Sequence, residues 1–215
     1  MKKEIILTPE ELYYMGALLQ AKYIDYAYVA AMGDIQQRRE IYESESREGL
    51  AKKGILMEDF SGNLDVDRES EKLLEPVFFG MLESSADVTA MTEGDAPVTR
   101  GRRFHFYEGR LTATEFIKGQ IRLETYDEGK MQEWIHGLLP ADYEDRPEVL
   151  PVRELNKKAV SRMFVIKSTH VGEKAAVTIY VEAKGRVFCE RQDGMAAALT
   201  KEQFCLEIYR ALKGE

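Results

Sequence analysis

The sequence has little cysteine, and its two cysteines, Cys189 and Cys205, allow at most one disulfide. Cys189 lies in an expected strand and Cys205 on the apolar side of an expected helix, where small buried thiols are common. Disulfide-stabilised secreted domains are denser in cysteine. We therefore interpret both residues as reduced thiols of a protein that belongs to a reducing compartment.

The sequence also lacks a long apolar run. Only three consecutive apolar residues follow the lysines at its start, which is too few for the core of a signal peptide. No run reaches the roughly 18 residues of a membrane-spanning helix. We therefore expect a cytoplasmic protein without membrane insertion.

Basic residues are outnumbered, with 30 Lys and Arg against 38 Asp and Glu and a formal net charge of -8. Binding to nucleic acid needs a basic surface that displaces counterions from phosphates. The charge balance therefore argues against a nucleic-acid partner. A hydrophobic content of 44% indicates a folded protein that buries a sizeable core.

Recognisable catalytic motifs are absent as well: there is no G-x-S-x-G, H-E-x-x-H, C-x-x-C or phosphate-binding glycine loop. The histidines, His105, His136 and His170, are far apart and show no metal-ligand spacing. His105 alternates with two phenylalanines, so we expect its side chain to face solvent. A pair of Cys189 with a histidine, or a pair of cleft carboxylates, stays open as an alternative. We otherwise expect no catalytic residue, no metal and no cofactor.

The stretch MEDFSGNLDVDRES begins like a calcium loop. An EF-hand loop needs Gly at its sixth position and a bidentate Glu at its twelfth. A loop that starts at Asp59 has Leu64 and Ser70 at those positions. The pattern favours instead a turn at the Ser-Gly-Asn tripeptide, with Asp65 or Asp67 capping the helix that follows.

The same region also fits a winged helix, in which a helix ending at Gly54 is followed by a hairpin wing. A wing that contacts DNA is normally basic. This one carries Glu58, Asp59, Asp65 and Asp67, so its charge has the wrong sign for phosphate binding.

Residues 1–84 are expected to be mainly helical. Thr8, Pro9 and Glu11 form a helix start with a capping box, and apolar residues at helical spacing continue this first helix through Tyr23 to a break at Gly33 and Asp34. Five tyrosines crowd the segment. They indicate either a surface covered by a partner, or rings that cover the sheet with their hydroxyls in water.

The rest of the chain repeats one pattern, a β-hairpin followed by a helix. It occurs over residues 86–139 and again over residues 160–215, with a linker rich in proline and acidic residues at 140–156. Gly109 and Gly185 occupy equivalent hairpin turns in the two copies.

We therefore predict one domain over residues 1–215 of the α+β class. Its centre is an antiparallel β-sheet with pseudo-two-fold symmetry, built from the two hairpin-plus-helix units and flanked by the N-terminal helical part.

The order of these motifs resembles a known family. A helix beginning LTPEELYYMGALL is followed by a helix end LAKKGIL, an acidic turn GNLDVD and the segment EKLLEPV. Strands then lead to KGRVFCERQDGMAAALTKEQFCLEIYRAL near the end of the chain. This order is similar to that of the EspG-like chaperones of type VII secretion systems, in a branch from low-GC Gram-positive bacteria. The D-x-x-x-GR pattern of the actinobacterial members is absent here.

The resemblance implies a non-enzymatic cytosolic chaperone or adaptor that keeps helical secretion substrates soluble for export. The implied partner is a helical secreted protein of the WXG100-like, LXG-like or PE/PPE-like kind. The family's binding loop corresponds here to residues 92–101. The candidate partner-binding residues are Thr92, Glu93, Asp95, Pro97, Val98 and Arg100.

Two other classes of function stay open at this point. One is an enzyme whose site is not recognisable from motifs, and the other is a ligand-binding or regulatory module. A perturbed carboxylate in a cleft, or a thiol that faces a pocket, would favour the enzyme.

Overall fold

The computed structural model describes residues 4–33, 39–91, 96–155, 160–170, 172–191 and 193–215. Ten strands follow one another in the hydrogen-bonding order β1-β7-β6-β5-β4-β9-β10-β11-β12-β8, and each pairing with a described register is antiparallel. The α+β class with a large antiparallel sheet is thus confirmed, while pseudo-two-fold symmetry stays a prediction.

The chain divides into two compact units, 1–81 with 105–126, and 82–104 with 127–215. Strand β5 (Val98–Tyr107) belongs to both. The first unit contains β1 (Glu4–Leu7), α1 (Pro9–Leu18), α2 (Tyr26–Ala31), α3 (Arg39–Lys52), β2 (Leu56–Glu58), β3 (Leu64–Val66), α4 (Arg68–Phe79), β6 (Arg110–Ile117) and β7 (Gln120–Tyr126).

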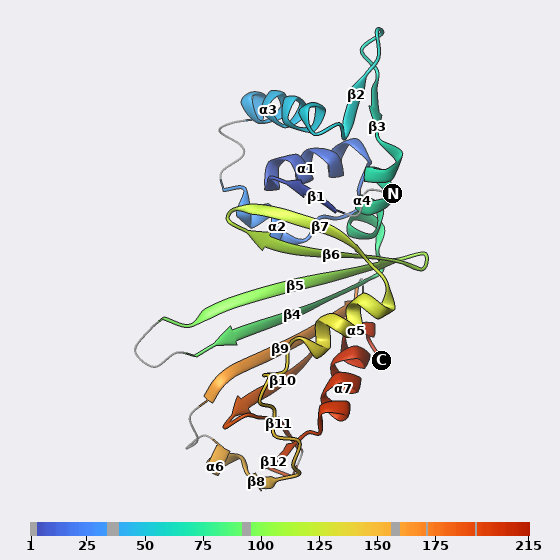
Figure 1. Ribbon diagram of the computed structural model, residues 1–215. Helices are drawn as coiled ribbons and strands as arrows, with labels where there is room; N and C mark the ends of the chain where they lie inside the picture. Colours follow the sequence, from blue (N-terminus) through green and yellow to red (C-terminus); the bar gives the residue numbers. More distant parts are fainter. Residues whose placement is uncertain (1–3, 34–38, 92–95, 156–159, 171, 192) are drawn as a thin grey trace. The chain divides into compact units, whose positions relative to one another are not determined.

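The second unit carries the rest of the sheet and its two covering helices, α5 and α7, which lie side by side in Figure 1. Its elements are β4 (Leu82–Ala90), α5 (Glu128–His136), β8 (Val149–Pro151), α6 (Val152–Leu155), β9 (Val160–His170), β10 (Ala176–Ala183), β11 (Arg186–Glu190), β12 (Met195–Ala198) and α7 (Lys201–Lys213).

Helix α1 starts where the sequence predicts and ends earlier. The capping box is formed in full: Glu11 N donates to Thr8 Oγ1, and Thr8 N donates to Glu11 Oε2. The helix stops at Leu18, followed by Gln20 with a φ of 55°. The predicted single helix up to Gly33 is therefore wrong, because a left-handed residue interrupts the helical hydrogen bonds and a separate helix, α2, covers Tyr26–Ala31.

The tight hairpin turns are confirmed. Two consecutive residues with positive φ occur in three of these turns: Glu108–Gly109, Lys118–Gly119 and Lys184–Gly185. Two left-handed residues in a row make the type I′ turn, whose twist matches that of the flanking strands, and glycine fits the second position without strain.

His105 is buried, which contradicts the expectation that it faces solvent. Its side chain is 3% exposed, and its Nε2 lies 3.0 Å from the Tyr28 hydroxyl. The same hydroxyl lies 2.5 Å from Thr114 Oγ1. The alternation argument fails because the strand has polar residues on a face that the buried Tyr28 ring covers, so hydrogen bonds replace water there.

The crowded tyrosines divide between core and surface. Tyr28 is fully buried and Tyr26 is largely exposed, while Tyr13, Tyr14 and Tyr23 are half-buried. The core of the first unit contains Tyr28 together with residues from β1, α1, α3, α4 and β7.

Candidate partner-binding surface

The predicted binding loop joins β4 to β5. Of the residues proposed for it, Thr92, Glu93 and Asp95 lie outside the described residues. Pro97, Val98 and Arg100 are all exposed. Val98 and Arg100 lie at the start of strand β5 and not in a loop. Their side chains are thus presented by a strand of the second unit.

One face of the sheet in this unit is covered by helix α7. The rings of Phe164 on β9 and Tyr180 on β10 both meet Phe204 of α7 edge-on, at centroid distances of 5.5 and 5.8 Å. Phe164 and Tyr180 are direct cross-strand partners, so they share a face. This face supplies the core between sheet and helix.

The opposite face carries apolar side chains that the described chain leaves accessible. Val165 pairs with Ile179, and their alternation with Phe164 and Tyr180 places both on the other side of the sheet. Ile179 is 50% exposed and the neighbouring Val177 52% exposed. We call the group Met163, Val165, Val177 and Ile179 the open sheet face.

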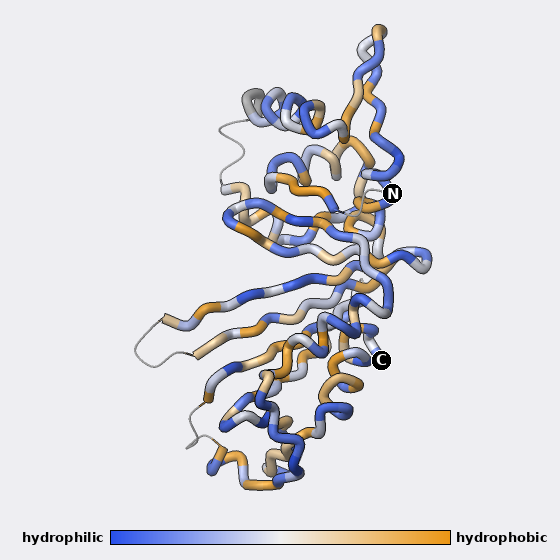
Figure 2. Tube along the Cα trace, viewed as in Figure 1, coloured by the Kyte–Doolittle hydropathy of each residue, from blue (hydrophilic) through white to orange (hydrophobic). Residues whose placement is uncertain are grey.

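This face is unusual for an exposed one. An antiparallel sheet with one solvated side normally shows polar residues there, as Lys167 opposite Val177 and Asp87 opposite Val165 do here. β-Branched apolar residues clustered between them form the kind of patch that marks interaction sites. Figure 2 shows the hydrophobic stretches in β9 and β10.

Asp87 and Gly101 meet at this surface. A Cβ atom on Gly101 would overlap Asp87 Oδ1, so the glycine lets the carboxylate lie against β5. Beside them, the hydroxyls of Thr89 and Thr99 lie 2.9 Å apart and join the outer ends of β4 and β5. These side chains order the strands that lead into the β4–β5 connection.

The thiols form a different arrangement from the Cys189–histidine pair that the sequence left open. Cys205 Sγ lies 3.4 Å from His136 Nδ1, beside a cavity of about 440 Å³ between α5 and α7. Burial raises the pKa of the Cys205 thiol, and burial together with Glu207 and Glu190 raises that of Cys189. Because only the thiolate is nucleophilic, these shifts oppose catalysis by either residue.

No sequence signal pointed to the Cys205–His136 contact, since 69 positions separate the two residues. The packing of α5 against α7 brings them together.

The acidic loop of residues 57–70 folds as the hairpin β2–β3 followed by α4. Asp59 Oδ1 accepts hydrogen bonds from Ser61 N and Asn63 N, and Asp59 Oδ2 accepts one from Asn63 Nδ2. Asp67 caps α4 by accepting from Ser70 N. The predicted turn and cap are confirmed, and the hairpin matches the wing of the winged-helix interpretation.

Within the described residues, no group of three or more His, Cys, Asp or Glu side chains has a geometry that could hold a metal ion. The helices described here are also too short or too polar to cross a membrane.

Comparisons with known proteins gave a result at the level of structure. No protein-family model matches the sequence, and no curated protein is detectably similar to it. The solved structure of the Mycobacterium tuberculosis type VII secretion system chaperone EspG5, in complex with a PE25-PPE41 dimer, is similar with a TM-score of 0.64. The match covers 98% of this chain and 96% of that chain at 9% sequence identity. The chain therefore has an EspG-like fold.

Proposed function

We propose that this protein is a non-enzymatic chaperone or adaptor in the cytoplasm, which binds a helical substrate of a type VII-like secretion system and keeps it soluble for export. Two observations support the proposal. The fold is that of a chaperone solved with a PE25-PPE41 dimer. The second unit also exposes an apolar sheet face, which a partner would remove from water.

The open sheet face is the observation that carries the proposal. Val177 and Ile179 present β-branched side chains, which are stiff about χ1, from the part of β10 that pairs with β9. Little side-chain entropy is lost when such residues bind. Each is about half exposed, so burying the rest of one is worth about 0.8–1.5 kcal/mol, or roughly a fourfold to tenfold gain in affinity.

The substrate in this proposal is a helical protein of the PE/PPE-like, WXG100-like or LXG-like kind. The apolar end of a helical hairpin would cover Val177 and Ile179, and the β4–β5 connection would border it. Thr92, Glu93, Asp95, Pro97, Val98 and Arg100 are proposed to line that border.

Co-expression with small helical proteins encoded by adjacent genes tests the proposal. We expect one of them to co-purify with the protein and to be more soluble in its presence. Ile179→Asp places a charge on the open sheet face, so it should reduce the affinity by at least about tenfold.

Val149→Asp is the matched control. Val149 lies in β8 of the same unit and is 55% exposed, so the same charge is introduced away from the open sheet face. Affinity should not change in this variant. The proposal fails if no helical protein encoded by an adjacent gene binds. If both variants bind the substrate with equal affinity, the open sheet face is excluded as the binding site.

A further inference from the structure

The hairpin β2–β3 presents an aromatic side chain to solvent. We call residues Leu56–Val66 the arm. Phe60 at its turn is fully exposed. The tip of the arm is coloured as hydrophobic in Figure 2. An accessible phenylalanine at the end of a projecting hairpin is a natural anchor for a partner, because aromatic side chains dominate binding energies.

The arm is an ordered structure, so Phe60 is exposed at a defined turn and not at a frayed chain end. Leu56 is buried, and Leu64 and Val66 pack against the core of the first unit. Arg47 of α3 forms an ion pair with Glu58 at 2.5 Å. The Asp59 hydrogen bonds close the turn. A preordered surface loses little entropy when it binds.

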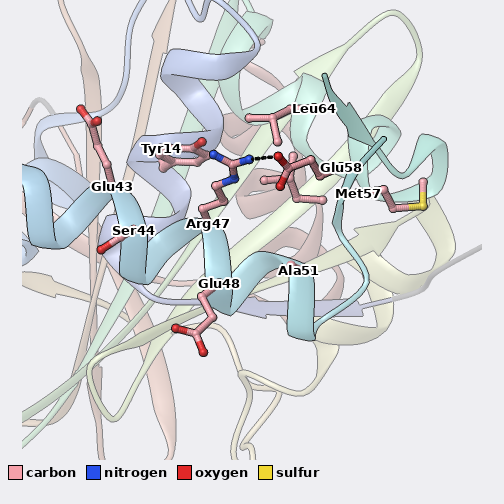
Figure 3. Close-up of a pocket in the computed structure, with 10 residues that line it drawn as sticks. Tyr14, Glu43, Ser44, Arg47, Glu48, Ala51, Met57, Glu58 and Leu64 are labelled. Atoms are coloured by element: carbon pink, nitrogen blue, oxygen red, sulfur yellow. Dashed lines mark ion pairs between the residues drawn. The ribbon is translucent and has the colours of Figure 1, made fainter. Parts of the chain in front are cut away.

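A groove of about 600 Å³ lies between α3 and the arm. Figure 3 shows Arg47 reaching from α3 to Glu58 across it, beside Tyr14 and Leu64. The groove is lined by Tyr14, Ala51, Leu56 and Leu64. Around them lie the carboxylates of Glu43, Glu48 and Glu58 and the guanidinium of Arg47, so the lining has a net negative charge.

The charge of the arm selects what can bind there. The arm contains three acidic residues, Glu58, Asp59 and Asp65, and no basic one, and Asp67 follows directly after it. Such a surface repels phosphates and anionic lipid headgroups, so nucleic acid and a bacterial membrane are disfavoured as occupants. A cationic protein segment is complementary to it in charge.

We propose that the groove and Phe60 together form a docking site for an amphipathic helical segment of a second protein, with apolar side chains on one face and Lys or Arg beside them. The apolar face packs on Tyr14, Leu56 and Leu64, Phe60 covers its end, and its cations face the carboxylates of the arm. This site belongs to the first unit and does not depend on the proposal for the open sheet face, which lies in the second.

The test uses a labelled synthetic amphipathic helix of about four turns with leucines on one face and lysines on the other. The control peptide has glutamate in place of each lysine. We expect the full-length protein to bind only the lysine peptide, with an affinity that falls as salt increases.

Two matched pairs of variants locate the binding. Ala51 is exposed on α3 and lines the groove. Ala51→Lys should weaken binding of the lysine peptide by about tenfold, whereas Ala51→Glu, with a side chain of similar size, should bind at least as well as the parent protein. Phe60→Ser should weaken binding by a similar factor, and Tyr26→Ser, at an exposed aromatic outside the arm, should not.

The exposed positions of these variants leave the fold intact, which unchanged melting temperatures will establish. Equal binding by Ala51→Lys and Ala51→Glu, or by Phe60→Ser and Tyr26→Ser, would overturn the proposal. Equal binding of both peptides would overturn it too. Phe60-dependent binding to phosphatidylserine vesicles would assign the arm to a membrane instead.

Discussion

The carboxylate of Glu11 lies against the backbone of Gly49, where α1 packs on α3. Glu11 is 5% exposed, and its Oε2 accepts hydrogen bonds from Thr8 N at 2.7 Å and from Lys53 Nζ at 2.5 Å. A Cβ atom on Gly49 would overlap Glu11 Oε1. The cap of one helix therefore depends on a glycine in the middle of another.

Gly49→Ala should destabilise the protein, although alanine is the better helix former. The substitution gains about 1 kcal/mol of helix propensity. It also displaces a buried carboxylate from its hydrogen bonds, which costs about 1.5–3 kcal/mol for a charged group. We expect a net loss of about 1 kcal/mol in the free energy of unfolding, measured by denaturant titration.

Gly129→Ala provides the control for that experiment. Gly129 lies in the first turn of α5, is exposed, and a Cβ there would make only an ordinary contact with Asp127. This variant should be as stable as the parent or slightly more stable. If Gly49→Ala is stabilised to the same extent, the close approach of Glu11 does not constrain α3.

Glu11 illustrates which contacts the sequence predicts. Its capping role follows from the local pattern with Thr8 and Pro9, and the capping box is present in the structure. Its contact with Lys53 spans 42 positions and is set by the packing of α1 on α3, which no local pattern encodes. Interactions between residues that are close together in the sequence can be predicted from local patterns, whereas interactions fixed by tertiary packing cannot.

The candidate site shows the same division. The sequence VTIYV of β10 predicts a strand with alternating faces, but both faces carry apolar or aromatic residues. Which of Ile179 and Tyr180 faces the core depends on where α7 packs, and only the structure shows that Tyr180 meets Phe204. The burial of His105 was mispredicted for the same reason, because Tyr28 reaches it from another element.

The buried contact of Tyr28 should be important for stability. Its hydroxyl lies within hydrogen-bonding distance of His105 Nε2 and Thr114 Oγ1. Tyr28→Phe keeps the ring and removes the hydroxyl, so two buried polar groups lose one partner. We expect the free energy of unfolding to fall by about 1–3 kcal/mol.

Tyr26→Phe separates this effect from a general effect of removing a tyrosine hydroxyl. Tyr26 is exposed in the same helix, so its stability change should stay within about 0.5 kcal/mol. Equal effects of the two substitutions would show that the buried hydrogen bonds make no net contribution.

The turn of the arm should respond to acid. Hydrogen bonds from Asn63 hold the pKa of Asp59 below its usual range. A folded-state pKa below the unfolded value of about 3.9 means that the charged carboxylate favours the folded turn. This contribution is complete above the unfolded pKa and is lost as the pH falls through the folded one.

Asn63→Ala should therefore move the pKa of Asp59 back towards its ordinary value, as followed by a carboxyl carbon NMR titration. Ser61→Ala is its counterpart, because Ser61 contributes a backbone N–H that alanine retains. The pKa of Asp59 should not move in that variant. A pKa that is ordinary in the parent protein would contradict the hydrogen-bonded turn.

Alkylation of Cys205 distinguishes a half-buried, unreactive thiol from a catalytic one. Burial raises the pKa of Cys205, although Lys201 opposes the shift. At pH 7 the folded protein, tested in a Cys189→Ser background, should react with iodoacetamide more slowly than the denatured chain does, and the rate should increase with pH. Since the folded-state pKa is raised, the stability linked to this thiol is present at neutral pH and is lost as the pH rises through that pKa.

His136→Ala should change the rate by less than about threefold, because burial and not the imidazole governs the thiol's reactivity. A fall of about tenfold or more at pH 7 would instead show that His136 activates Cys205 as a nucleophile and would favour an enzymatic function.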